Sequence, residues 1–169
     1  MNKTTLQVEA GKQELFIYRE FDAPRDLVFK AFTDANLLAQ WMNPCNMTMH
    51  IDEYESVDGG AYHFTHTDPM GGKHVFRGVM HEVNAPERLI RTFEYLNLPE
   101  RGHVVLDVLT LESLPGNRTR LTIQSVFRSV ADRDGMVQAG MENGVTESHQ
   151  LLDGLLARLS VRNMAIPMG

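Results

Sequence analysis

The spacing of hydrophobic residues changes several times along the chain. Residues 15–21 (LFIYREF) are rich in aromatic and β-branched residues, which predicts a strand. In residues 24–42 the apolar positions instead recur every three or four residues, which predicts two short helices. Pro24 suits a first helical turn, where its missing N–H has no partner, and Pro44 prevents much continuation beyond Trp41. This part of the chain is therefore predicted to be a strand followed by a helix pair.

Residues 47–128 have no helical period and are predicted to form about six strands. Turn sequences interrupt them at intervals of roughly ten residues, among them DGG at 58–60, DPMGGK at 68–73 and LPGN at 114–117. Because no helical segment lies between these turns, the strands are expected to form an antiparallel meander.

The helical period returns in the last part of the chain and predicts one long helix from about Ala131 to Leu159. The element order gives an α+β fold with a curved antiparallel sheet of six or seven strands. Such a sheet must bury one face, and only the terminal helix is long enough to cover it. A twisted sheet wrapped around one helix leaves space between them, so we expect a cavity there.

Two glycines interrupt the predicted terminal helix. Gly140 and Gly144 lie four residues apart, where each costs about 1 kcal/mol relative to alanine in a helix interior. Either the helix approaches the sheet closely at this turn, or the missing side chains leave room for a ligand. Met136 and Met141 nearby are flexible side chains that suit both interpretations.

Composition and charge exclude several classes of protein. The chain has 169 residues, a net charge of −6 and a pI near 5.6, which argues against nucleic-acid binding. We expect a single domain over residues 1–169, with its core at about 14–160. Residues 1–14 are polar and no later segment could span a bilayer, so no membrane association is expected. The single cysteine, Cys45, excludes an intramolecular disulfide and fits a cytoplasmic protein.

The sequence has no strong catalytic or metal-binding motif. His63 and His66 are three apart on a predicted strand, so their rings point to opposite faces. Neither an H-E-x-x-H, a G-x-S-x-G nor a P-loop motif occurs, and we expect no metal and no cofactor. Cys45, a lone cysteine after a proline in a loop, is expected to be inert rather than a nucleophile.

Five segments together carry a resemblance to a known family: FDAPRDLVFKAFTDANLLAQWMNP, DGGAYHF, RGVMHEVNAPERLIRTFEY, TRLTIQSVF and AGMENGVTESHQLLDGLLARL. The chain resembles the Hsp90-ATPase-activator-homologue (AHSA1-like) family of the START/Bet v 1-like, or SRPBCC, superfamily over about residues 14–160. The resemblance implies the helix-grip fold, and the superfamily includes lipid carriers, hormone receptors, cyclases and a co-chaperone. Met42 and Val145 stand where members often carry an aromatic residue and a tryptophan, which implies a differently shaped pocket.

From these patterns we expect a mostly apolar pocket between the sheet and the terminal helix. A few polar groups, drawn from His66, a tyrosine hydroxyl, Glu82 or Arg91, would orient the ligand. Trp41 is expected to anchor the helix pair in the core and also to line the cavity mouth. The predicted ligand-binding residues are Trp41, Tyr62, Phe64, His66, Met80, Phe93, Tyr95, Met141, Gly144 and Val145.

The favoured functional hypothesis is binding of a small hydrophobic molecule in this cavity. A co-chaperone acting on Hsp90 and a cofactor-free enzyme of the cyclase or hydrolase type remain as alternatives. Hsp90 is the less favoured partner, because eukaryotic co-chaperones of this kind carry an additional N-terminal domain for which this chain has no room. A homodimer is a further candidate assembly.

Overall fold

The computed structural model describes residues 2–165, with side chains up to Arg162. Its elements follow the predicted order, with one additional strand at the start. They are β1 (Thr5–Gln7), β2 (Glu14–Phe21), α1 (Arg25–Thr33), α2 (Ala35–Leu38), β3 (Thr48–Tyr54), β4 (Ala61–Thr67), β5 (Lys73–Asn84), β6 (Arg88–Tyr95), β7 (Val105–Leu114), β8 (Arg118–Val126), α3 (Val130–Gln138) and α4 (Met141–Ala165).

The strands form one curved antiparallel sheet in the order β1-β2-β8-β7-β6-β5-β4-β3. It has eight strands within the described residues, so the prediction of six or seven was too low. The additional strand is β1, which pairs with β2 from Thr5 opposite Tyr18 to Gln7 opposite Phe16. A strand of three residues is too short to show alternation, and its sequence therefore looked like a polar lead-in.

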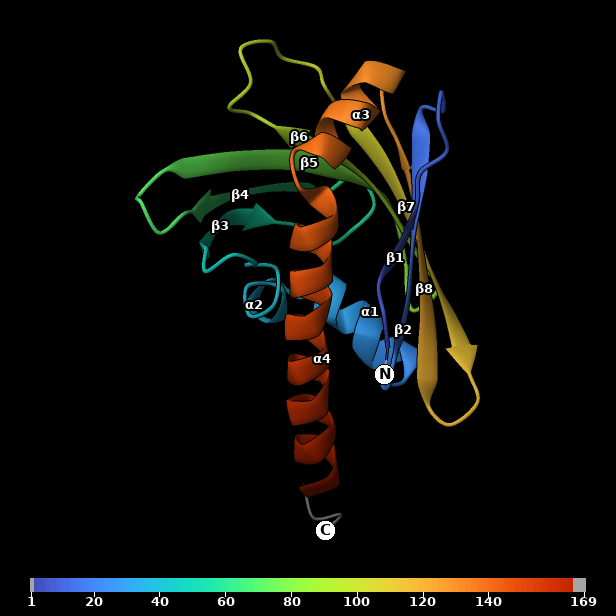
Figure 1. The fold of residues 1–169 in the computed structure, drawn as a ribbon. Helices are drawn as coiled ribbons and strands as arrows, with labels where there is room; N and C mark the ends of the chain where they lie inside the picture. The colour runs from blue at the N-terminus through green and yellow to red at the C-terminus, as the bar shows by residue number, and fades with distance from the viewer. Residues whose placement is uncertain (1, 166–169) are drawn as a thin grey trace.

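The helices cover the concave face of this sheet. Figure 1 shows α4 standing across the concavity, with α1 and α2 at one end of the sheet. Leu152, Leu155 and Leu156 of α4 are fully buried against the core. The arrangement is the predicted helix-grip fold.

The terminal helix is not continuous, contrary to the prediction. It is divided into α3 and α4 by Gly140, whose φ of 95° lies in the left-handed region. Glycine adopts this conformation without the steric cost that a Cβ would impose. Gly140 therefore ends α3 and redirects the chain, and α4 continues beyond the predicted end at Leu159.

The helix pair after β2 is shorter than predicted at its second member. α2 is a single turn, and Asp34 begins it by accepting a hydrogen bond from the Leu37 N–H at 3.1 Å. Trp41 follows this turn instead of lying within a regular helix.

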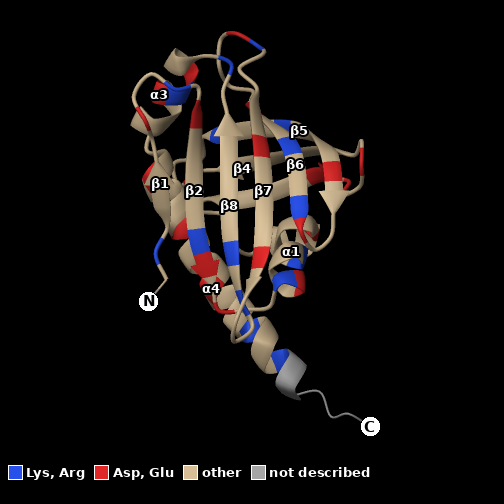
Figure 2. Cartoon of the chain, turned by 90° about the vertical axis from the view of Figure 1, so that its right-hand side faces the viewer, with Lys and Arg blue, Asp and Glu red and all other residues tan. Residues whose placement is uncertain are grey.

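The outer face of the sheet is polar and carries both signs of charge. Figure 2 shows Lys and Arg interspersed with Asp and Glu along β2, β8, β7 and β6. Glu20 illustrates the pattern, because it pairs with Arg118 at 3.2 Å and with Arg120 at 3.4 Å. None of the described helices is long and apolar enough to cross a membrane.

Candidate functional site: a cavity beneath the terminal helix

A cavity of about 340 Å³ lies between the concave sheet face and the first turns of α4. This volume is within the range of about 300–1,000 Å³ that small-molecule sites occupy. Its sheet wall consists of Ile17, Phe64, His66, Phe76, Arg91, Phe93, Val105, Asp107, Ile123, Ser125 and Phe127. Its remaining wall consists of Phe32, Trp41, Met42, Pro44, Met136, Met141, Gly144, Val145, Ser148 and His149.

One side of the cavity is an aromatic wall built across β4, β5 and β6. Phe64 and Phe76 are directly opposite each other on paired strands, with ring centroids 5.1 Å apart. Phe93 on β6 continues the stack at 5.1 Å from Phe76. Side chains on paired strands that point to the same face meet in this way because residues alternate between the two faces. The result is a continuous apolar wall of nearly parallel rings.

Trp41 packs in the core as predicted and also borders the cavity. Its side chain is buried, its indole N–H donates to the Ala31 carbonyl at 2.9 Å, and its ring meets Phe32 edge-on at 4.8 Å. The same residue lines the cavity. Trp41 therefore fixes the helix pair against the sheet while it forms part of the cavity wall.

Gly144 lies where the α4 backbone borders the cavity. A Cβ added at this position would have no heavy atom within 4 Å. The close-approach explanation for this glycine is thus excluded, because nothing packs tightly against it. Its missing side chain leaves space over this turn.

A second hollow of about 540 Å³ adjoins the cavity at the end of the sheet near α3. The two share Phe93, Val105, Phe127 and Met136 as walls. In Figure 1, α3 and the loop between β6 and β7 lie together at this end of the molecule. The cavity and the second hollow therefore meet at these four side chains.

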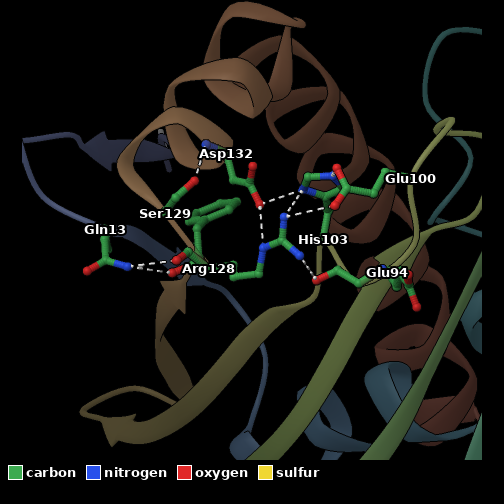
Figure 3. A network of polar contacts seen from close by, with 9 residues as sticks. Gln13, Glu94, Glu100, His103, Arg128, Ser129 and Asp132 are labelled. Atoms are coloured by element: carbon green, nitrogen blue, oxygen red, sulfur yellow. Dashed lines mark hydrogen bonds and ion pairs between the residues drawn. The ribbon is translucent and has the colours of Figure 1, made fainter.

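A polar network fixes the rim of this second hollow. His103 contacts Asp132 through Nδ1 at 2.8 Å, and Arg128 lies 3.9 Å from the same carboxylate (Figure 3). The hydrogen bond that His103 donates to Asp132 raises the pKa of His103 and lowers the pKa of Asp132. Glu94 accepts the Gly102 N–H at 2.7 Å. The His103–Asp132 contact ties the β6–β7 loop to the start of α3, and the Glu94–Gly102 bond ties the same loop to β6.

Residues 22–157 match the family described as Activator of Hsp90 ATPase homolog 1-like protein. The chain belongs to this family. Its fold is similar to that of a crystal structure from Rhodobacter sphaeroides, at 26% identity and a TM-score of 0.80 over 92% of this chain and 99% of that one. A solution structure from Arthrobacter aurescens has 26% identity and a TM-score of 0.82, covering 91% of each chain. No curated protein matches this chain.

A more distant neighbour in this fold is an Hsp90 activator from Plasmodium falciparum. It has 20% identity and a TM-score of 0.51, over 68% of this chain and 72% of that one. At this level the likeness shows the fold alone.

The AHSA1-like fold brings most of the predicted ligand-binding residues to one place. Seven of the ten line the cavity: Trp41, Phe64, His66, Phe93, Met141, Gly144 and Val145. Tyr62, Met80 and Tyr95 lie outside its wall. Met80 is fully buried in the core, the Tyr62 hydroxyl donates to the Thr92 carbonyl, and Tyr95 lines the second hollow instead. Glu82 is also absent from the wall and pairs with Arg88 at 2.9 Å.

The sequence analysis missed several polar residues of the cavity. Asp107, Ser125, Ser148 and His149 all line it, and all belong to elements whose helical or strand character was predicted. Strand alternation assigns Asp107 and Ser125 each to one face of its own strand. Only the pairing register of β7 and β8 places Asp107 directly opposite Ser125. Their position therefore depended on information that a single sequence does not contain.

Two histidines of the cavity are held in the neutral form. Burial lowers the pKa of His66, although its Nε2 lies 2.7 Å from the Met42 carbonyl oxygen. Burial and the Arg19 charge lower the pKa of His149 to about 3. An imidazole that hydrogen-bonds a carbonyl must donate to it, which leaves Nδ1 of His66 as an acceptor. Both rings therefore present uncharged polar groups at neutral pH.

Cys45 does not have the properties of an activated nucleophile. It is an exposed residue, and partial desolvation of its thiol together with the nearby Glu147 carboxylate raises the pKa of that thiol. A raised pKa reduces the thiolate fraction on which reactivity depends. No group of three metal-ligating side chains occurs among the described residues.

Proposed function

We propose that this protein binds a small hydrophobic molecule in the cavity between its sheet and α4. The observation that carries the proposal is the open space beneath Gly144, enclosed by the aromatic wall of Phe64, Phe76 and Phe93. Small-molecule sites are typically concave and mostly apolar, with a few fixed polar groups. This cavity has that composition.

The helical side of the cavity supports the proposal in a second way. Three methionines line the cavity: Met42, which follows α2, Met136 on α3 and Met141 on α4. Methionine is unbranched and polarisable, so its side chain adapts to ligands of different shape. A wall of this kind suits a site that admits a molecule without rearranging the backbone.

The proposal is tested by titration with N-phenyl-1-naphthylamine, an uncharged dye that fluoresces in apolar surroundings. We expect saturable binding to the wild-type protein. Gly144→Leu should abolish it, because the new side chain would project into the cavity. Gly154→Leu is the matched control, since it makes the same change in the same helix, away from the cavity, where a Cβ has only Arg158 at 3.5 Å.

Two results would contradict the proposal. The first is a folded Gly144→Leu variant that binds the dye as well as the wild type, which would locate the dye elsewhere. The second is an absence of saturable binding to the wild type. In that case the family description directs the next measurement, which is the stimulation of Hsp90 ATPase activity by this protein.

Native mass spectrometry of protein purified from its own host then addresses the natural ligand. A retained molecule would give its mass directly. A mass that changes during incubation would favour the enzymatic alternative over a carrier.

A further inference from the structure

Three polar side chains form a row across the middle of the concave sheet face. Arg91 on β6 is directly opposite Asp107 on β7, and Asp107 is directly opposite Ser125 on β8. All three line the cavity. The row continues into apolar residues at both ends, because Met80 pairs with Arg91 and Leu15 pairs with Ser125, and both are fully buried.

Asp107 and Ser125, two of the three members of this row, are hydrogen-bonded to each other. The Ser125 hydroxyl donates to the Asp107 carboxylate at 2.6 Å. Burial nevertheless raises the pKa of Asp107, and Arg91 only partly offsets this effect. Burial of this carboxyl group therefore disfavours its charged form.

Arg91 is the member whose hydrogen bonding is incomplete. Burial opposes the charge of its guanidinium, but the neighbouring Tyr54, Tyr62 and Asp107 together raise its pKa, with Tyr54 as a hydrogen-bond partner. Arg91 is 8% exposed, and its Nε has no hydrogen-bond partner in the described part of the chain. The guanidinium lies 6.0 Å from the Tyr62 ring centroid, which is a weak cation–π distance. No ion pair within 4.0 Å joins it to a carboxylate of residues 2–162. A buried guanidinium keeps its charge and requires acceptors in its plane.

We infer that the cavity selects a planar aromatic molecule carrying an anionic oxygen group, such as a carboxylate, which binds Arg91. This inference rests on the proposed function and adds the chemical class of the ligand. The aromatic body lies against Phe64, Phe76 and Phe93, while the acidic group supplies an acceptor for the Arg91 Nε, which has none among the described residues. Arginine binds carboxylates through two parallel hydrogen bonds, which would also fix the orientation of the ligand.

A pair of dyes separates the acidic group from the apolar body. The dye 8-anilino-1-naphthalenesulfonate shares the aromatic framework of N-phenyl-1-naphthylamine and adds one sulfonate. We expect Arg91→Met to weaken binding of the sulfonated dye at least about tenfold and to leave binding of the uncharged dye unchanged or tighter. Arg77→Met is the matched control, because it removes the same charge from an exposed position on β5.

A second measurement needs no variant and covers the case in which Arg91→Met does not fold. Here 2-naphthoate and the uncharged 2-naphthamide compete for the bound neutral dye on the wild-type protein. We expect the carboxylate to compete at least about tenfold more strongly than the amide. A competition that is equal, or that favours the amide, would overturn the inference.

The outcomes distinguish this inference from the proposed function. If the wild type fails to bind the neutral dye, the proposed function itself is wrong. If the neutral dye binds and Gly144→Leu blocks it, but Arg91→Met weakens both dyes equally or neither, only the assignment of Arg91 as the anion-binding group is wrong.

Discussion

His149, one of the two buried histidines of the cavity, makes the free energy of unfolding depend on pH, and the size of this effect can be calculated. His149 is 3% exposed, and its Nδ1 lies 2.8 Å from the Thr4 hydroxyl. That hydroxyl also accepts the Arg19 Nε–H at 3.3 Å, so its own proton is available to His149. The imidazole is therefore an acceptor at Nδ1 and uncharged, and a protonated ring would face the Arg19 guanidinium without water.

The sign and size of the effect follow from the two pKa values. Burial and Arg19 lower the pKa of His149 from 6.5 to about 3, so the folded state binds fewer protons than the unfolded state. The contribution is fully present above pH 6.5 and is lost as the pH falls toward 3, by about 1.4 kcal/mol per pH unit. Between pH 7 and pH 5 the free energy of unfolding should decrease by about 2 kcal/mol from this residue alone.

His149→Asn isolates this contribution, because asparagine does not titrate and retains an acceptor for Thr4. Urea unfolding followed by Trp41 fluorescence gives the free energy of unfolding of both proteins at pH 7 and pH 5. Other groups, including His103 with its raised pKa, titrate in both proteins and cancel in the difference. We expect the wild type to lose about 2 kcal/mol more than the variant. A difference below about 0.5 kcal/mol would show that His149 is protonated or solvated in the folded protein.

Two further predictions concern packing and the helix break. Trp41→Ala should lower the free energy of unfolding by about 3–5 kcal/mol in urea titrations followed by circular dichroism, because the buried indole would leave a void; a loss below about 1 kcal/mol would mean that the ring contributes little to the core. Gly144→Ala should stabilise by up to about 1 kcal/mol, since its Cβ meets open space, whereas Gly140→Ala should destabilise by about 1 kcal/mol or more at its positive φ; equal effects of the two substitutions would contradict this assignment.

Much of the fold could be predicted because its local signals agree with the tertiary structure. The turn sequences at 58–60 and 68–73 lie between strands as expected, and alternation correctly placed Tyr62, Phe64 and His66 on the inner face of β4. The break at Gly140 could not be predicted in the same way. A glycine in a helical pattern is compatible with both a tolerated interior position and a left-handed residue between two helices. The structure has the second arrangement, with Gly140 at positive φ between α3 and α4.

The cavity was predicted at the right interface, but its polar residues were not. Arg91 was one of four candidates for orienting a ligand, and the strand pattern alone could not rank it above Glu82. The two differ because of a register shift in β5 between Met80 and Glu82, where the pairing with β6 becomes irregular. Glu82 then pairs with Arg88 outside the cavity, while Arg91 remains opposite Asp107 inside it.

The two halves of α4 have different surroundings. Toward its C-terminal half, Leu152, Leu155 and Leu156 are buried and complete the core. Toward its start, Gly144 and Val145 border open space over the polar row of the sheet. A buried arginine in that space lowers stability unless something pairs with it, and well-packed apolar residues there would be at least as stable. The first turns of α4 therefore preserve a space that folding does not require, which is the physical reason to look for a ligand there.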